Sequence, residues 1–168
     1  VCAALPQVQV DLSYDENGEQ QVYLNGECVS TAIRENIISH YASCVSKIPQ
    51  VRAFLLDTQR SLSRRYNIIM DGRDIGTVIF PQAKVKIFLF ASAKERARRR
   101  VAELKARGQD VSFSQILAEM EERDARDATR AVAPCVPAAD AVMLDSSALD
   151  FEQTVDAVLS IIREKSEG

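Results

Sequence analysis

The sequence predicts an α/β fold with a parallel sheet, and three observations support that prediction. Short, almost continuously apolar runs at residues 68–70, 85–90 and 141–144 have the composition of strands buried on both faces. Segments with helical periodicity or helix-capping pairs follow these runs. The alternation of strands and helices implies a parallel sheet with right-handed crossovers.

The first 30 residues predict a separate, small antiparallel β unit. Apolar and polar residues alternate over residues 8–12, and two further short strands are expected at 20–24 and 27–29. The dipeptides Asn17-Gly18 and Asn25-Gly26 are strong hairpin-turn signals between these strands. Such a meander is polar enough to be an insertion on a larger domain.

Five helices are predicted, at residues 31–47, 50–64, 93–107, 113–130 and after Asp150. Ser92 and Glu95 form an S-x-x-E capping box for the third helix, and Gly108 is a natural stop for it. Asp150 and Gln153 are expected to cap the last helix in the same way.

Composition narrows the class of protein. The 168 residues are 46% hydrophobic, which is enough for one domain with an appendage, and the net charge of −3 argues for neither a nucleic acid nor a membrane partner. The cysteines, Cys2, Cys28, Cys44 and Cys135, are scattered, as is typical of reduced thiols in a cytoplasmic protein. No apolar run approaches membrane-spanning length, and no signal peptide is visible.

The run at 68–70 stops abruptly at Asp71, Gly72, Arg73 and Asp74. Ligands of open parallel sheets bind beyond the carboxyl ends of the strands, so these charged groups are candidates for a binding site, with Gly72 allowing the backbone to bend. The alternative is a strand end with a surface ion pair, in which Asp74 caps the following turn.

Two arginine groups extend the charged pattern. Arg96 and Arg100 share one face at the start of a predicted helix, where the helix dipole favours acidic side chains. Basic side chains placed against that preference suggest that an anionic ligand binds there. Arg123, Asp127 and Arg130 are spaced i, i+4 and i+7 on another helix, a stripe able to grip a phosphate. The alternatives are a solvated basic face and a run of intrahelical ion pairs.

The residues favour chemistry that needs many positive donors and no proton-transfer base. His40 is the only histidine and lies far in sequence from the charged motifs, and no His/Cys spacing suits a metal. Phosphoryl transfer onto a phosphate acceptor fits, because the acceptor oxygen is already anionic and catalysis rests on positioning and charge neutralisation.

Two long motifs stand out in the chain. The first is Asp71-Gly72-Arg73-Asp74-Ile75-Gly76-Thr77-Val78-Ile79-Phe80-Pro81, followed by Val85-Lys86-Ile87-Phe88-Leu89, and the second is the stretch from Glu122-Arg123-Asp124 to Ala133-Pro134. Both resemble the motifs of bacterial cytidylate kinases. The resemblance covers nearly the whole chain in the family's order and includes the β meander, which resembles the family's nucleoside-monophosphate insert.

The resemblance implies a P-loop nucleoside monophosphate kinase core, truncated at its N-terminus, with a small antiparallel β insert. Residues 1–48 would form the insert, and residues 49–168 the kinase core with its lid region. The family transfers the terminal phosphate of ATP to CMP or dCMP with Mg²⁺. It implies a cytoplasmic enzyme, monomeric when intact, that binds no nucleic acid or membrane.

The resemblance also implies residue roles. Arg73 would hold the CMP phosphate, oriented by Asp71. The cytosine would be faced by Asp74, Arg52 and Arg130, and the sugar by Ser43, Arg123 and Asp127. Arg96 and Arg100 would lie on the ATP side, although the neighbouring Arg98 and Arg99 leave an alternative register open. Arg73, Arg96, Arg100 and Arg123 are the candidate catalytic residues, and no residue is assigned to a metal.

The 168 residues depart from the family pattern in one respect. They contain no G-x-x-x-x-G-K-[ST], the loop whose amides and lysine cradle ATP and whose hydroxyl holds Mg²⁺. Alternative functions are therefore a non-catalytic CMP-binding fragment and, from another class, a helix that binds nucleic acid through residues 96–107.

We predict that these 168 residues alone do not make CDP from ATP and CMP, because the phosphate loop supplies preorganised donors that the transition state needs. A coupled kinase assay on protein of verified intact mass tests this. Turnover near ordinary kinase rates, on the order of 1–100 per second, would overturn the prediction.

Overall fold

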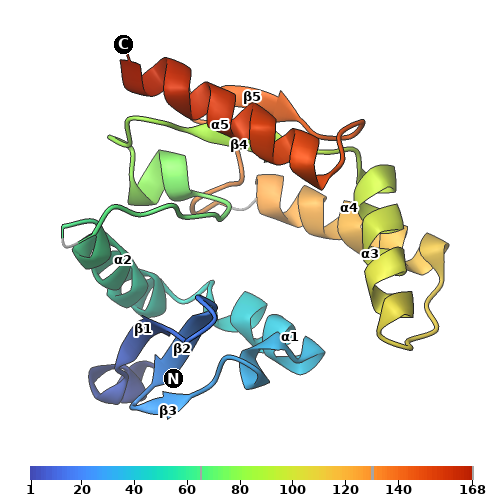
Figure 1. Ribbon diagram of the computed structural model, residues 1–168. Coiled ribbons are helices and arrows are strands. Elements are labelled where there is room, and N and C mark those ends of the chain that lie inside the picture. The colour runs from blue at the N-terminus through green and yellow to red at the C-terminus, as the bar shows by residue number, and fades with distance from the viewer. Residues whose placement is uncertain (65, 130, 168) are drawn as a thin grey trace. The chain divides into compact units, whose positions relative to one another are not determined.

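The structure is a computed structural model that describes residues 1–64, 66–129 and 131–167, with side chains 36, 39, 40 and 43 outside the description. The chain divides into two compact units, Val1–Ile68 and Ile69–Gly168, each described by itself (Figure 1). This division lies later in the chain than the boundary at residues 48 and 49 that the sequence suggests, and the functional division at 48 stays a prediction.

The predicted meander is confirmed in the first unit. Strands β1 (Val10–Tyr14), β2 (Gln20–Leu24) and β3 (Glu27–Cys28) form an antiparallel sheet in that order. Asn25 and Gly26 both have positive φ, 51° and 85°, which is the signature of a two-residue type I′ turn. This turn matches the twist of the strands that it joins.

The helices of the first unit follow the prediction in part. They are η1 (Cys2–Gln7), η2 (Ala32–Arg34), α1 (Asn36–Val45) and α2 (Pro49–Ser63). Pro49 occupies the first turn of α2, where its missing N–H costs nothing. The single helix predicted over 31–47 is wrong, because Glu35 is extended, with φ −67° and ψ 143°, and separates η2 from α1. No Gly or Pro lies near Glu35 to signal this break.

The second unit contains the parallel pair that the sequence predicts. Strands β4 (Ile87–Phe90) and β5 (Val142–Asp145) pair in parallel, with Ile87 opposite Val142 and Phe90 opposite Asp145. The helical elements are η3, a π-helical turn (Ile75–Ile79), α3 (Ala93–Ala106), α4 (Phe113–Thr129) and α5 (Phe151–Glu167). Helices α3 and α4 pack against each other (Figure 1).

The strand predicted at residues 68–70 is wrong. These residues belong to no sheet, and Ile69 is 97% exposed. A strand requires a neighbour to take its backbone hydrogen bonds, and within the described ranges β4 and β5 pair only with each other. The apolar composition of 68–70 therefore does not by itself place the segment in a sheet.

The two predicted capping boxes have different outcomes. Asp150 and Gln153 cap α5 reciprocally: the Gln153 N–H donates to Asp150 Oδ1 (2.8 Å), and the Asp150 N–H donates to Gln153 Oε1 (3.0 Å). At α3 only half of the box forms, in which the Glu95 N–H donates to Ser92 Oγ (3.2 Å). The Ser92 N–H donates instead to Ser147 Oγ (2.9 Å). The start of α3 is thus fastened to the loop after β5.

Helix α3 ends at a glycine that requires a left-handed backbone. Gly108 has φ 77°, its N–H donates to the Lys105 carbonyl, and the Gln109 N–H donates to the Leu104 carbonyl, a Schellman motif.

Among the described residues, none of the helices combines the length and apolar content needed to cross a bilayer.

We expect Gly108→Ala to lower the free energy of unfolding by about 1 kcal/mol, because a Cβ opposes the left-handed conformation. Gly108→Asn should cost less, since asparagine tolerates this region. Chemical denaturation measures both. Equal stability of Gly108→Ala and the unsubstituted protein would contradict the role of this residue in ending α3.

Candidate functional site

The charged motif at residues 71–74 precedes η3 directly, and η3 fixes its conformation. The Asp74 carbonyl accepts the N–H groups of Val78 (2.9 Å) and Ile79 (3.2 Å). A Cβ on Gly72 would lie 2.9 Å from Cγ1 and Cδ1 of Ile75, so a larger residue at position 72 would require that side chain to shift. The bend inferred from sequence therefore has a steric rather than a φ-based reason.

Arg73, Arg123 and Asp127 form an arginine–aspartate cluster. Arg73 Nε donates to Asp127 Oδ2 at 2.7 Å, across 54 positions of sequence. Arg123, one helical turn before Asp127 on α4, places its Nε 3.8 Å from the same oxygen. Two guanidinium groups thus share one carboxylate oxygen, which leaves the cluster with an excess positive charge that suits an anionic ligand.

The electrostatics of the cluster agree with that excess charge. Partial burial lowers the pKa of the Arg123 guanidinium, and the nearby charge of Arg73 lowers it further, while Asp127 and Asp124 act in the opposite direction. Arg123 nevertheless keeps its charge at neutral pH, because a guanidinium does not lose its proton in proteins. An additional anion between Arg73 and Arg123 would relieve their mutual repulsion.

The two predicted carboxylates of the motif differ in exposure. Asp74 is 9% exposed, whereas Asp71 lies on the surface. A buried carboxylate is suited to selective hydrogen bonding, because an imperfect partner leaves it unsatisfied at a cost. Asp74 is the stronger candidate for reading a ligand's hydrogen-bond pattern.

Arg96 and Arg100 are engaged with acids of the two packed helices. The Arg96 guanidinium makes a bidentate ion pair with Asp124 of α4, and its Nε donates to the Ala91 carbonyl (3.0 Å). Arg100 pairs with Glu103 (2.8 Å) on its own helix. Arg96 therefore fastens α3 to α4, and a role of either arginine on the ATP side stays a prediction.

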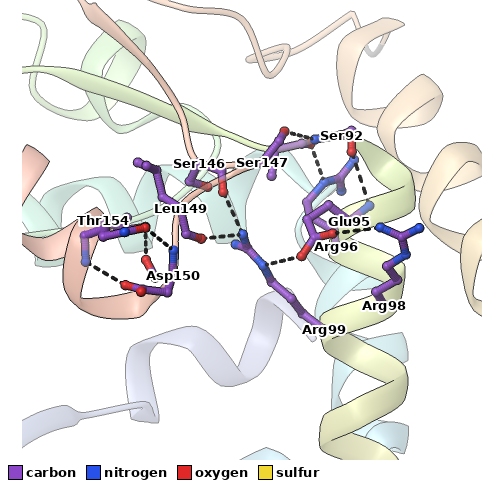
Figure 2. Close-up of polar contacts among 12 residues, drawn as sticks. Ser92, Glu95, Arg96, Arg98, Arg99, Ser146, Ser147, Leu149, Asp150 and Thr154 are labelled. Atoms are coloured by element: carbon purple, nitrogen blue, oxygen red, sulfur yellow. Dashed lines mark hydrogen bonds and ion pairs between the residues drawn. The ribbon is translucent and has the colours of Figure 1, made fainter.

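Arg99, which the sequence interpretation did not select, lies at a cleft. Its terminal nitrogen donates to the carbonyls of Ser146 (2.6 Å) and Leu149 (3.1 Å), and its Nε pairs with Glu95 (3.3 Å) (Figure 2). The cleft has a volume of about 370 Å³ and is lined by Leu89, Arg99, Ser146, Leu149, Asp150, Phe151 and Thr154. The sequence pattern gave no sign of these contacts, because the carbonyls that Arg99 meets lie 47 and 50 positions further along the chain.

Serines fix the loop that forms one wall of this cleft. Ser146, which is 4% exposed, donates its N–H to the Phe90 carbonyl at 2.8 Å and its hydroxyl to the same oxygen at 3.1 Å. Ser147 donates its hydroxyl to Asp145 Oδ1 (2.6 Å). Hydrogen bonds from Ser147 lower the pKa of the Asp145 carboxyl. These hydrogen bonds tie the loop to the end of β4 and to the last residue of β5.

The remaining predicted site residues are not tested by this geometry. Ser43 and Arg52 belong to α1 and α2 of the first unit, and the Ser43 side chain lies outside the description. Arg130 lies outside the described residues. Their assignments stay predictions from the resemblance.

The second unit therefore defines a protein that gathers two arginines and a carboxylate into one cluster, directly next in sequence to the buried Asp74, an arrangement suited to phosphorylated ligands. The chain matches the family model described as Cytidylate kinase over residues 3–164. It belongs to the cytidylate kinase family, which confirms the resemblance.

Curated relatives agree with this membership. The chain is 50% identical to the cytidylate kinase of Erwinia tasmaniensis, 51% to that of Klebsiella pneumoniae and 50% to that of Escherichia coli K12. Each match extends over 149 residues, 89% of this chain and 66% of the relative. The chain thus spans just under two thirds of the length of these relatives.

The Arg96–Asp124 pair gives a prediction on stability. In a double-mutant cycle with Arg96→Ala and Asp124→Ala, we expect a coupling energy of about 0.5–1 kcal/mol, because both side chains are partly exposed and the contact is bidentate. The control cycle is Arg98 with Glu95, where Arg98 is 61% exposed and the contact is longer, at 3.4 Å. Denaturant unfolding measures both cycles. Coupling no larger than in the control would mean that Arg96 does not fasten α3 to α4.

Proposed function

We propose that the protein transfers the terminal phosphate of ATP to CMP or dCMP, giving CDP or dCDP. The observation that carries the proposal is the arginine–aspartate cluster beside a buried Asp74, in a chain of the cytidylate kinase family. The cluster supplies donors for a phosphate and Asp74 supplies an acceptor for a base. These are the two groups that a nucleoside monophosphate presents.

In this proposal Arg73 holds the phosphate of the acceptor nucleotide. Its bond to Asp127 uses Nε, and the two terminal nitrogens have the fork geometry that suits phosphate oxygens. Asp71 orients Arg73. Asp127 accepts hydrogen bonds only, so together with Arg123 and Ser43 it suits the hydroxyl groups of the sugar.

Asp74, Arg52 and Arg130 are proposed to read the base. Cytosine offers an exocyclic amine as donor and ring N3 as acceptor, and uracil presents the opposite pattern at both positions. A carboxylate can only accept and a guanidinium can only donate, so Asp74 and Arg130 complement cytosine and mismatch uracil.

The donor nucleotide is proposed to lie along the start of α3. Arg96 and Arg100 are the residues that the resemblance suggests there, and the cleft beside Arg99 is the candidate for the base of ATP. The cleft combines a guanidinium with the exposed apolar side chains of Leu89 and Phe151, which are suited to a planar ring.

The resemblance implies Mg²⁺ bound with ATP. Within residues 1–64, 66–129 and 131–167, no group of three or more His, Cys, Asp or Glu residues is placed to hold a metal ion. The resemblance assigns no residue of this chain to Mg²⁺. The acceptor phosphate attacks as an anion, so the chain's own contribution to the chemistry is to position the nucleotide and neutralise charge.

The contacts of α3 weigh against the nucleic-acid alternative. Arg98 and Arg99 pair with Glu95, Arg100 and Arg107 with Glu103, and Arg96 with Asp124. Acids thus balance much of the positive charge that a nucleic-acid backbone would need. A non-catalytic CMP-binding protein differs from the proposed kinase only in turnover, which an assay of the complete protein decides.

We predict that Asp74→Ala in the complete protein lowers kcat/KM for CMP much more than for UMP. The loss should correspond to roughly 1–3 kcal/mol, the cost of leaving a buried polar partner unsatisfied. Arg73→Ala is the control and should weaken CMP and UMP alike, since both carry the phosphate. The measurement is kcat/KM for each substrate with each variant. If Asp74→Ala leaves the CMP-to-UMP ratio unchanged, Asp74 does not read the base and only supports the turn that follows it.

A further inference from the structure

Lys86 is a buried lysine that the proposed chemistry does not use. It lies beside the start of β4, within the apolar run at 85–90, and its side chain is only 7% exposed. Lysines are almost never buried unless the ammonium group is paired, because moving an unpaired charge out of water is costly. Its partners therefore indicate why the residue is there.

The ammonium group of Lys86 bridges two segments that are distant in sequence. Nζ donates to the Pro81 carbonyl and to Asp140 Oδ2, both at 2.6 Å. The hydrogen bond from Lys86 lowers the pKa of the Asp140 carboxyl. Pro81 follows η3, and Asp140 precedes β5, so one charged group joins the two connections.

The stem of Lys86 also packs against η3 itself. A Cβ on Gly76 would lie 3.3 Å from Lys86 Cδ, 3.5 Å from Cγ and 3.8 Å from the Ala138 Cβ. Glycine at position 76 thus lets the lysine stem pass close to the π-helical turn. Lys86 contacts η3 through its methylene groups and the end of the same segment through its charge.

Each of these segments continues into one half of the arginine–aspartate cluster. Arg73 and Asp74 come directly before η3, and Asp74 accepts the first N–H groups of that turn. On the other side, the segment after α4 is anchored to Asp127, whose carbonyl accepts the Cys135 N–H (2.8 Å). Lys86 therefore joins the segment that follows Arg73 and Asp74 to the segment that follows Asp127.

We propose that Lys86 is a positioning residue for the acceptor nucleotide, holding the segment of Arg73 and Asp74 in register with the segment of Arg123 and Asp127. The inference rests on the proposed function and extends it. It assigns Lys86 no contact with a nucleotide. Its loss should therefore change CMP binding through the placement of Arg73, and should leave the donor nucleotide unaffected.

The test uses Lys86→Met in the complete protein, because methionine keeps a long apolar stem over Gly76 and removes both hydrogen bonds. We expect the Kd for CMP, measured by calorimetry, to rise about tenfold and the Kd for ATP to change less than about twofold, the pattern of a misplaced binding group. The matched control is Lys84→Met. Lys84 lies two residues earlier and donates to the Ser166 carbonyl (2.9 Å), so its loss should change neither Kd.

A double substitution separates positioning from a general loss of structure. In the Arg73→Ala background, Lys86→Met should weaken CMP by less than about twofold, because the group that it positions is already absent. Asp140→Ala removes the same ion pair from its exposed side, at a side chain that is 65% exposed, and we expect it to weaken CMP in the same direction by a smaller factor, because Lys86 keeps its bond to the Pro81 carbonyl.

The outcomes distinguish the inference from the proposed function. An unsubstituted protein that binds no CMP would overturn both. If that protein binds CMP and Arg73→Ala weakens it, the inference alone fails when Lys86→Met and Asp140→Ala leave the Kd for CMP unchanged. It also fails when the effects of Lys86→Met and Arg73→Ala simply add.

Discussion

The parallel pairing of β4 with β5 is the constraint on which the second unit depends. Pairing Phe90 with Asp145 brings the two carboxyl ends of the strands to one edge. Ser146 extends the pairing by donating its N–H to the Phe90 carbonyl. The hydroxyl of Ser147 then accepts the N–H of Ser92, the N-cap residue of α3. The cleft beside Arg99 is built from these loop residues. Without the strand register, its walls would have no fixed separation.

The arginine–aspartate cluster is a second level of organisation, added to that framework by charge. The positive charges of Arg73 and Arg123 repel each other, and the Asp127 carboxylate offsets that repulsion. Its Oδ2 lies 2.7 Å from Arg73 Nε and 3.8 Å from Arg123 Nε. Arg123 and Asp127 are neighbours on one helix, four residues apart, so their contact is local in sequence. The contact between Arg73 and Asp127 joins residues that are far apart in sequence. Such a cluster is stable with its own carboxylate yet has donors suited to an anion.

Local rules predicted several turns and helix ends whose partners are close in sequence, although the box of Ser92 and Glu95 forms only in half. The Asn-Gly turn at residues 25 and 26, the cap of α5 by Asp150 and Gln153, and the stop at Gly108 all follow from short-range hydrogen bonds and φ preferences. Residues 85–90 and 68–70 have similar apolar composition, but only the first contributes to a strand. Composition indicates that a segment can be buried, and only a partner strand makes it part of a sheet.

The candidate site shows the same limit of sequence reasoning. The spacing of Arg123 and Asp127 predicted a stripe on one helix, but neither that pattern nor the resemblance paired Asp127 with Arg73, which lies 54 positions earlier. On α3, periodicity shows which arginines share a face without showing which face meets the cleft. The buried Ala97 and Leu104 fix the packed side of α3, and the resulting rotation brings Arg99 to the loop and Arg96 to α4.

The contact between Ser92 and Ser147 has a consequence for how this family can vary. One hydroxyl oxygen joins two loops that are 55 residues apart, and it replaces a bond that Glu95 would otherwise supply from within α3. In a relative without a hydroxyl at position 147, the N–H of residue 92 loses its acceptor. The cap is then complete only if the side chain at position 95 accepts that N–H. Sequence change in one loop is therefore expected to be correlated with change in the other.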